Sequence, residues 1–103
     1  MLRIHRVAVN VVRQVRPLVK DIAVHDRNLA DHITRSSVAV VLNIAEASGV
    51  RGNRRLRHET ALGEAAEVRG GLDIGEAAGW TVVPRQARED LARMVGTLVK
   101  LTR

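Results

Sequence analysis

Apolar residues recur every three or four positions along most of the chain, and this spacing constrains the fold more than any other feature. In the first segment the apolar repeat runs from Ile4 to Ile22, with basic residues between its members. Such a repeat places side chains on one face of an α-helix. The same reasoning predicts four helices, at about residues 3–23, 27–48, 53–78 and 84–102. We therefore expect an all-α protein.

The segments between these helices carry recognisable boundary residues. Asp26 is an acceptable N-cap for the second helix, and residues 79–84 form a turn that places Pro84 at the first helical position. Pro17 lacks an N–H group and predicts a kink or break in the first helix. Four helices joined by short loops form an up-down bundle, and 103 residues suffice for one such domain, spanning 1–103.

The two middle helices are apolar on two sides. One stripe of the second helix contains Leu29, Ile33, Val40 and Ile44, and one face of the third contains Leu56, Gly63, Gly70 and Ile74. A helix that is apolar nearly all round must be covered nearly all round. A lone bundle needs one stripe per helix, so we expect the remaining stripes to form an interface between copies of the chain. These are Val38, Leu42 and Ala45 of the second helix and Ala61, Ala65, Val68 and Leu72 of the third.

Glycine is frequent in the third helix, where each residue costs roughly 1 kcal/mol relative to alanine. Four lie in its interior: Gly63, Gly70, Gly71 and Gly75. We expect them to allow close approach of neighbouring helices, and a locally weak helix is the alternative.

The charge balance favours an anionic partner. Lys and Arg total 17 against 11 acidic residues, for a net charge of +6, and most of these cations are Arg. Such a balance suits nucleic acid or another anionic surface, although a G·C-rich genome also enriches Arg. Trp80 is the one aromatic residue, so the core must consist of aliphatic side chains. The absence of cysteine excludes disulfides and thiolate catalysis.

Positive charge is concentrated around the turn between the second and third helices. A helix start is electropositive and disfavours cations, but several arginines lie at the start of the third helix. Glu59 is the only nearby acidic residue that we expect to offset their repulsion. We expect Gly49 to close one helix in a left-handed conformation and the Asn53 side chain to cap the next. Free amides with clustered guanidinium groups predict a phosphate site, and a solvated basic turn is the alternative. The candidate residues are Arg51, Arg54, Arg55 and Arg57.

The first helix carries a second set of cations, which is either its solvated side or an auxiliary phosphate-tracking surface. The set comprises Arg3, Arg6, Arg13, Arg16 and Lys20.

No pattern in the sequence indicates catalysis. His5, His25, His32 and His58 have no partner at metal-ligand spacing, and no glycine-rich phosphate loop follows a strand. We expect no enzyme activity, no metal and no cofactor. No run approaches the roughly 20 apolar residues of a membrane span, and no targeting segment is visible. We therefore expect a soluble cytoplasmic protein without membrane contact.

Three segments between Asn28 and Trp80 resemble a bacterial family. Residues 33–40 (ITRSSVAV) are similar to its LRRAAVSI, and residues 43–49 (NIAEASG) to its NIAEGYG. Residues 61–67 (ALGEAAE), with Leu72 and Gly79-Trp80, are similar to its ALGSLAE…L…GY. The chain thus resembles the four-helix-bundle proteins first noted in intervening sequences of 23S ribosomal RNA genes.

The resemblance implies a bundle that assembles as a ring of five and a basic, non-catalytic protein that binds nucleic acid. A related branch comprises accessory proteins of diversity-generating retroelements, which bind a reverse transcriptase with its RNA. Arg35, Asn43, Glu46 and Glu67 match family positions. We interpret them as structural, because a charge beside an apolar stripe must be paired or reach water. We expect Arg35 to pair with Glu46 or Glu67.

Two functions follow as hypotheses. The first is a non-catalytic oligomer that binds DNA or RNA mainly through phosphates, with little sequence specificity because aromatic interleaving is absent. It would act as an accessory subunit of a ribonucleoprotein or reverse transcriptase. The second is a protein–protein scaffold ring, without a direct nucleic-acid role, whose basic faces contact acidic protein surface.

Overall fold

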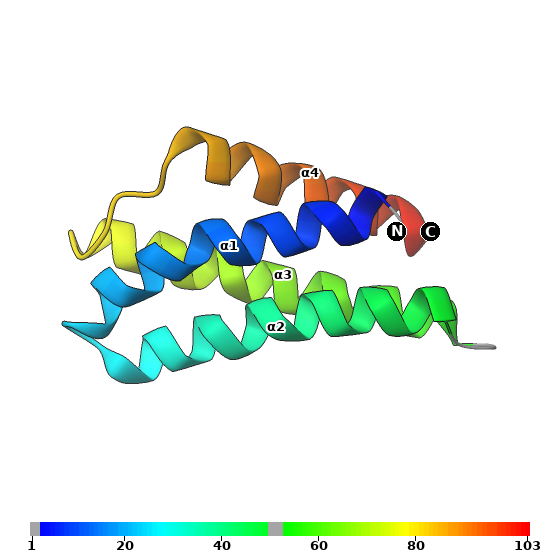
Figure 1. Ribbon diagram of the computed structural model, residues 1–103, viewed down its shortest axis with the longest axis horizontal. Helices are drawn as coiled ribbons and strands as arrows, with labels where there is room; N and C mark the ends of the chain where they lie inside the picture. The colour runs from blue at the N-terminus through cyan, green and yellow to red at the C-terminus, as the bar shows by residue number, and fades with distance from the viewer. Residues whose placement is uncertain (1–2, 50–52) are drawn as a thin grey trace.

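The computed structural model describes residues 3–49 and 53–103, and it contains four helices. They are α1 (Arg3–Ala23), α2 (Arg27–Gly49), α3 (Arg54–Ala77) and α4 (Arg85–Leu101). Each helix runs antiparallel to the next, and the two chain ends lie at the same end of the bundle (Figure 1). The all-α, up-down arrangement is as predicted, and the helix bounds agree within one residue at every end.

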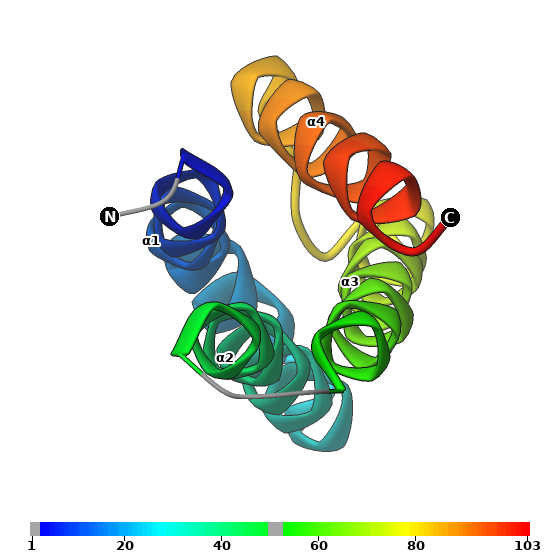
Figure 2. The ribbon, with the colours of Figure 1, turned by 90° about the vertical axis from the view of Figure 1, so that its right-hand side faces the viewer.

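The core is aliphatic, as the composition requires. Its most deeply buried side chains come from all four helices. They are Ile22 of α1, Ile33, Val40 and Ile44 of α2, Val68 and Leu72 of α3, and Met94 and Leu98 of α4. Seen along the bundle, the helices follow one another in the order of the chain around this core (Figure 2). The described bundle measures 42 × 24 × 22 Å.

The helix boundaries confirm some local predictions and correct others. Asp26 caps α2 through a hydrogen bond from the Leu29 N–H to its Oδ1 at 2.9 Å. Pro17 lies on the exposed surface within an uninterrupted α1, so the predicted break is wrong. Proline removes one backbone hydrogen bond, and on the solvent side water can satisfy the freed carbonyl. Pro84 precedes α4 as its N-cap with extended backbone, one residue earlier than predicted.

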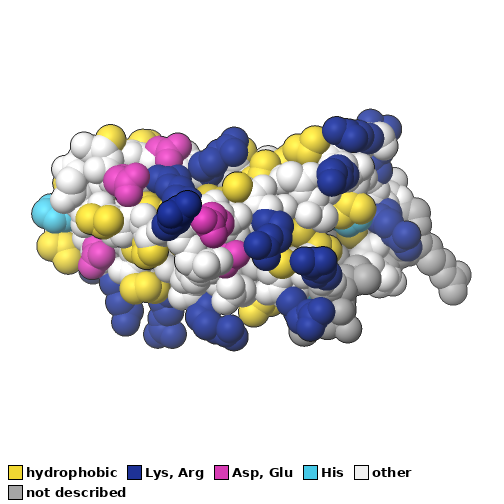
Figure 3. Space-filling view, turned by 90° about the horizontal axis from the view of Figure 1, so that it is seen from above, with side chains coloured by type: hydrophobic (Ala, Val, Ile, Leu, Met, Phe, Trp, Pro, Cys, Tyr) yellow, Lys and Arg dark blue, Asp and Glu magenta, His cyan; other side chains and the backbone are white. Residues whose placement is uncertain are grey.

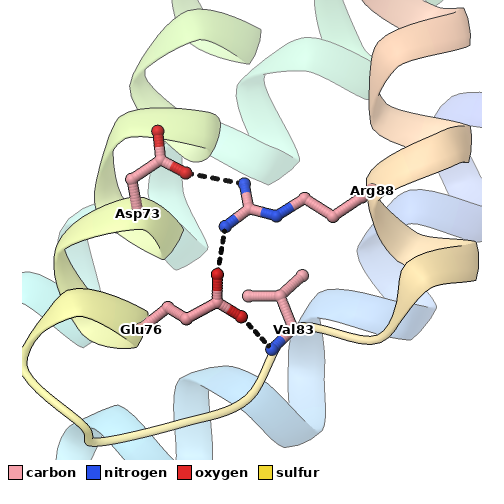
Figure 4. A network of polar contacts seen from close by, with 4 residues as sticks. All are labelled: Asp73, Glu76, Val83 and Arg88. Atoms are coloured by element: carbon pink, nitrogen blue, oxygen red, sulfur yellow. Dashed lines mark hydrogen bonds and ion pairs between the residues drawn. The ribbon is translucent and has the colours of Figure 1, made fainter.

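The connection between α3 and α4 is held by a polar network (Figure 4). Glu76 Oε2 accepts the Val83 N–H at 2.9 Å, and its Oε1 contacts Arg88 at 3.1 Å. Arg88 also contacts Asp73 Oδ1 at 2.7 Å. The Val83 hydrogen bond and then Arg88 hold the pKa of Glu76 below its ordinary value. This network fixes the start of α4 against the end of α3.

The same connection also contacts the end of α1. Gly79 has a φ of 77°, which glycine adopts without steric cost and which reverses the chain after α3. The Trp80 ring then stacks on His25 at a centroid distance of 5.6 Å, and Thr81 donates to Asp21 Oδ2 at 3.0 Å. Trp80 therefore has a structural role at this end of the bundle.

Candidate nucleic-acid interface

The arginines at the turn between α2 and α3 have local partners. Arg54 Nε donates to the Ala47 carbonyl at 3.1 Å, so this side chain satisfies a carbonyl in the last turn of α2. Arg55 contacts Glu59 at 3.1 Å, and Arg57 contacts Glu46 at 3.0 Å. The sequence interpretation anticipated Glu59 but missed Glu46, because that residue comes from the preceding helix. Arg51 lies outside the described residues.

The predicted capping at this turn differs in detail. Asn53 has a φ of 51° and makes no side-chain cap hydrogen bond, so it terminates the turn through its backbone conformation instead. Gly49 is the last residue of α2 and does not adopt a positive φ. The left-handed residue is thus Asn53, which tolerates this conformation better than most residues other than glycine. The predicted positions at the helix ends are confirmed, but the left-handed conformation of Gly49 and the side-chain cap of Asn53 are wrong.

The α1 cations, in contrast, are exposed and lie on one side of the helix, which we call the α1 basic edge. None of its five members forms an ion pair within residues 3–49 and 53–103. It consists of Arg3, Arg6, Arg13, Arg16 and Lys20. Because a helix rises 1.5 Å per residue, the edge extends about 25 Å along α1. Figure 3 shows a row of Lys and Arg side chains along the lower border, where α1 lies.

Arg93 of α4 adds a cation to this edge that the sequence interpretation missed. A groove between α1 and α4 is lined by Arg3 and Arg6 from one side and Arg93 from the other. Arg93 is 3.9 Å from Asp90, at the limit of an ion pair. The sequence position of Arg93 on an amphipathic helix gave no signal, because only the packing of α4 brings this side chain beside α1.

Asp90 positions α4 against α1 in this groove. Its buried carboxylate accepts from Asn10 Nδ2 at 3.1 Å, Gln14 Nε2 at 2.7 Å and Gln86 Nε2 at 3.0 Å. A buried carboxylate requires such donors, since an unpaired one is strongly destabilising. The network therefore sets the register in which Arg93 meets the α1 basic edge.

The family-matched polar residues have different partners from those expected. Glu46 pairs with Arg57, and Glu67 accepts from Ser36 at 3.3 Å and lies 3.9 Å from His32. Within the described chain, Arg35 pairs with neither carboxylate, so the expected ion pair is wrong for the single chain. Asn43 Nδ2 donates to the Ala39 carbonyl one turn earlier at 2.8 Å. These contacts are structural.

The carboxyl groups of Glu64 and Glu67 on α3 shift each other's pKa. A hydrogen bond with Glu67, followed by burial and the charge of Glu67, raises the pKa of Glu64. The same bond lowers the pKa of Glu67, with Ser36 and His32 contributing in the same direction. Both carboxylates lie outside any enclosed site, and no group of three metal-ligating side chains occurs in residues 3–49 and 53–103.

The two apolar stripes that we expected between copies of the chain differ in their exposure. Val38 and Leu42 are 44% and 55% exposed, and Ala45 is half-buried, so this α2 stripe does face outward. The α3 row was misassigned: Ala61, Ala65, Val68 and Leu72 are all at most 1% exposed and belong to the core of the single chain. The outward row of α3 is the other one, with Leu56 and Ile74 exposed. Both rows of α3 are apolar, so the sequence did not show which row is buried and which faces outward.

A solved structure shares this fold. It is a protein of unknown function from the S23 ribosomal protein family of Bacteroides thetaiotaomicron, with a TM-score of 0.81. The two sequences are 18% identical, and the match covers 97% of this chain and 98% of that one. No protein-family model and no curated protein matches the sequence. No helix in the described part of the chain is both long and apolar enough to cross a membrane.

Proposed function

We propose that this chain is a non-catalytic, homo-oligomeric bundle protein that binds nucleic acid mainly through phosphate contacts. The observation that carries the proposal is the α1 basic edge, a row of five exposed cations without carboxylate partners in the described chain. Unpaired guanidinium groups can form bidentate contacts with phosphate without first breaking an ion pair. Asp21 is the one carboxylate of α1, and it accepts a hydrogen bond from Thr81.

The arginines at the turn between α2 and α3 differ from the α1 basic edge in having local partners. Arg54, Arg55 and Arg57 each have a partner, and those contacts compete with phosphate. Exposed ion pairs are worth only about 0–1 kcal/mol, so the turn still contributes to an attractive field. We therefore assign the main contacts to the α1 basic edge with Arg93, and an auxiliary role to the turn.

Assembly into a ring would repeat this surface. We propose that Val38, Leu42 and Ala45 of α2, with Leu56 and Ile74 of α3, form the contact between copies, because they are apolar and face outward. The five-fold stoichiometry and a cytoplasmic, ribonucleoprotein or reverse-transcriptase role rest on the sequence resemblance. Repetition converts weak single contacts into tight overall binding.

Binding to labelled 20-nucleotide RNA and DNA tests the proposal by fluorescence anisotropy. The variant Arg13→Gln/Arg16→Gln/Lys20→Gln removes three members of the α1 basic edge. The matched control Arg27→Gln/Arg69→Gln/Arg85→Gln removes three cations from the other helices. We expect the first variant to lose at least tenfold in affinity and the control to lose much less. Equal losses would show that net charge, rather than the edge, determines binding.

The scaffold alternative is tested by a pull-down with and without nuclease. Exposed Val38 and Leu42 are compatible with a protein partner as well as with self-association. Retention of a protein partner after nuclease treatment would favour the scaffold. Its loss would favour nucleic acid as the primary ligand.

A further inference from the structure

The end of the bundle where the termini lie contains a cleft of about 550 Å³ to which all four helices contribute. This volume falls within the range of about 300–1,000 Å³ that is typical of small-molecule sites. Its apolar lining comes from Ile4 of α1, Ala47 of α2 and Leu101 of α4. Such a surface favours a hydrocarbon group over a fully hydrated ligand.

The charged groups that line the cleft are all cationic. Arg3 forms no ion pair within the described residues. Arg54 uses Nε to bind the Ala47 carbonyl, which leaves its terminal N–H groups without a recorded partner in the described chain. No carboxylate is among the described residues that line the cleft. An anionic group would therefore meet two guanidinium groups and no repulsive charge.

A buried histidine completes the lining. His58 is only 7% exposed, and its imidazole is among the groups that line the cleft. Burial, and then the charge of Arg54, lower the pKa of His58. Its imidazole is therefore neutral at pH 7 and offers one donor and one acceptor.

We propose that this cleft binds a small amphipathic anion, with its hydrocarbon body against Ile4, Ala47 and Leu101 and its carboxylate or phosphate head at Arg3, Arg54 and His58. The apolar lining selects against simple inorganic anions, and the two arginines select against neutral lipids. This site shares Arg3 with the α1 basic edge, but the other members of that edge do not line the cleft. It does not depend on the proposed nucleic-acid function.

Titration with sodium octanoate, followed by isothermal calorimetry and by the ring resonances of His58 in NMR, tests the proposal. Octyl phosphate is the second probe, and it distinguishes a phosphate head from a carboxylate head. Octan-1-ol and acetate serve as probes that lack the charge and the tail, respectively. The site variants are Arg3→Gln and Leu101→Glu, both at exposed positions and therefore compatible with folding. Arg13→Gln is the matched control, because it removes the same charge from α1 outside the cleft.

We expect one octanoate or octyl phosphate per chain, with saturable shifts of the His58 ring and much weaker binding of octan-1-ol and acetate. Loss of one charge-assisted contact should weaken binding about tenfold in Arg3→Gln, and Leu101→Glu should weaken it at least as much. Arg13→Gln should bind as the wild type does. The proposal is overturned if neither anion moves the His58 resonances. Equal losses in Arg3→Gln and Arg13→Gln, or equal affinity for octan-1-ol, would overturn it as well.

Discussion

At the residue scale, the buried carboxylate of Asp90 shows how separate segments combine into one polar centre. Its donors come from Asn10 and Gln14 on α1 and from Gln86 on its own helix. None of these residues signals the network from sequence, because an amide side chain on a helix face has no distinctive spacing. The contact depends on the packing of α1 against α4.

Replacing Asp90 with Asn should lower the free energy of unfolding by about 1–3 kcal/mol, because an NH2 donor replaces one of the two oxygens that accept from buried amide donors. Urea denaturation measures the change. Glu89→Gln is the matched control, since Glu89 forms only an exposed pair with Arg85 and should cost under about 1 kcal/mol. A loss in Asp90→Asn no larger than in the control would contradict the structural role of Asp90.

The lowered pKa of Glu76 predicts a pH dependence of stability. A carboxylate whose folded pKa lies below its ordinary value of 4.5 stabilises the fold above that pH. The contribution is lost as the pH falls through the folded pKa. Glu76→Gln should therefore lower Tm at pH 7, and its difference from the wild type should shrink as the pH falls below 4.5. A difference that stays constant from pH 7 to pH 3 in thermal melts would refute this role.

At the element scale, α3 explains both the success and the limit of the sequence prediction. Its helical character and bounds followed from periodicity, which is a local property. Its two apolar rows were equally compatible with burial, and the row that we expected between copies is the one buried in the single chain. The packing of α3 against α1 and α2 determines which row is buried. Gly71 lies against Ile33 of α2, and Gly75 lies against Ile22 of α1.

The glycines of α3 divide into two kinds. A Cβ added at Gly71 would lie 2.5 Å from Ile33 Cγ1, and one at Gly75 would lie 2.6 Å from Ile22 Cδ1. Gly63 and Gly70 have nothing within 4 Å of an added Cβ. The predicted close approach of helices is therefore confirmed for Gly71 and Gly75. For Gly63 and Gly70 the prediction is wrong, because no other helix of the same chain approaches them closely.

Gly71→Ala should consequently destabilise the fold by about 1–3 kcal/mol, because Ile33 is fully buried and cannot move without repacking. Gly96→Ala, within α4, should instead stabilise it by about 0.5–1 kcal/mol, since open space surrounds that position. Chemical denaturation of both variants provides the comparison. A stabilised Gly71→Ala protein would show that α3 does not approach α2 this closely.

At the scale of the whole molecule, the proposed self-association would use apolar side chains that remain exposed in the single chain. Val38→Asp/Leu42→Asp should reduce the mass measured by light scattering to that of one 11.3 kDa chain, because two charges cannot be buried in an apolar contact. Val24→Asp/Val82→Asp is the control. Val24 and Val82 are 80% and 79% exposed but lie outside the α2 stripe, and that variant should keep the wild-type mass. A monomeric wild type at micromolar concentration would contradict the assembly itself.

The global arrangement was accessible from sequence, whereas the pairing of charges was not. Short loops and four amphipathic segments are sufficient to predict an up-down bundle. The partners of Arg54 and Arg57 lie across the turn on α2, at Ala47 and Glu46, so a survey of neighbours along the chain missed them. As a result the sequence interpretation ranked the turn above the α1 basic edge, whereas our proposal gives the main contacts to the α1 basic edge.

The salt dependence of nucleic-acid binding tests the central claim most directly. The slope of log affinity against log salt concentration counts the phosphates that the protein neutralises, at about 0.7 per contact on single strands. Removing Arg13, Arg16 and Lys20 should reduce the steepness by about 2 for each chain engaged. Removing the side chains of Arg54, Arg55 and Arg57 should reduce it by less. A slope that the α1 variant leaves unchanged, or that falls more in the turn variant, would contradict the account.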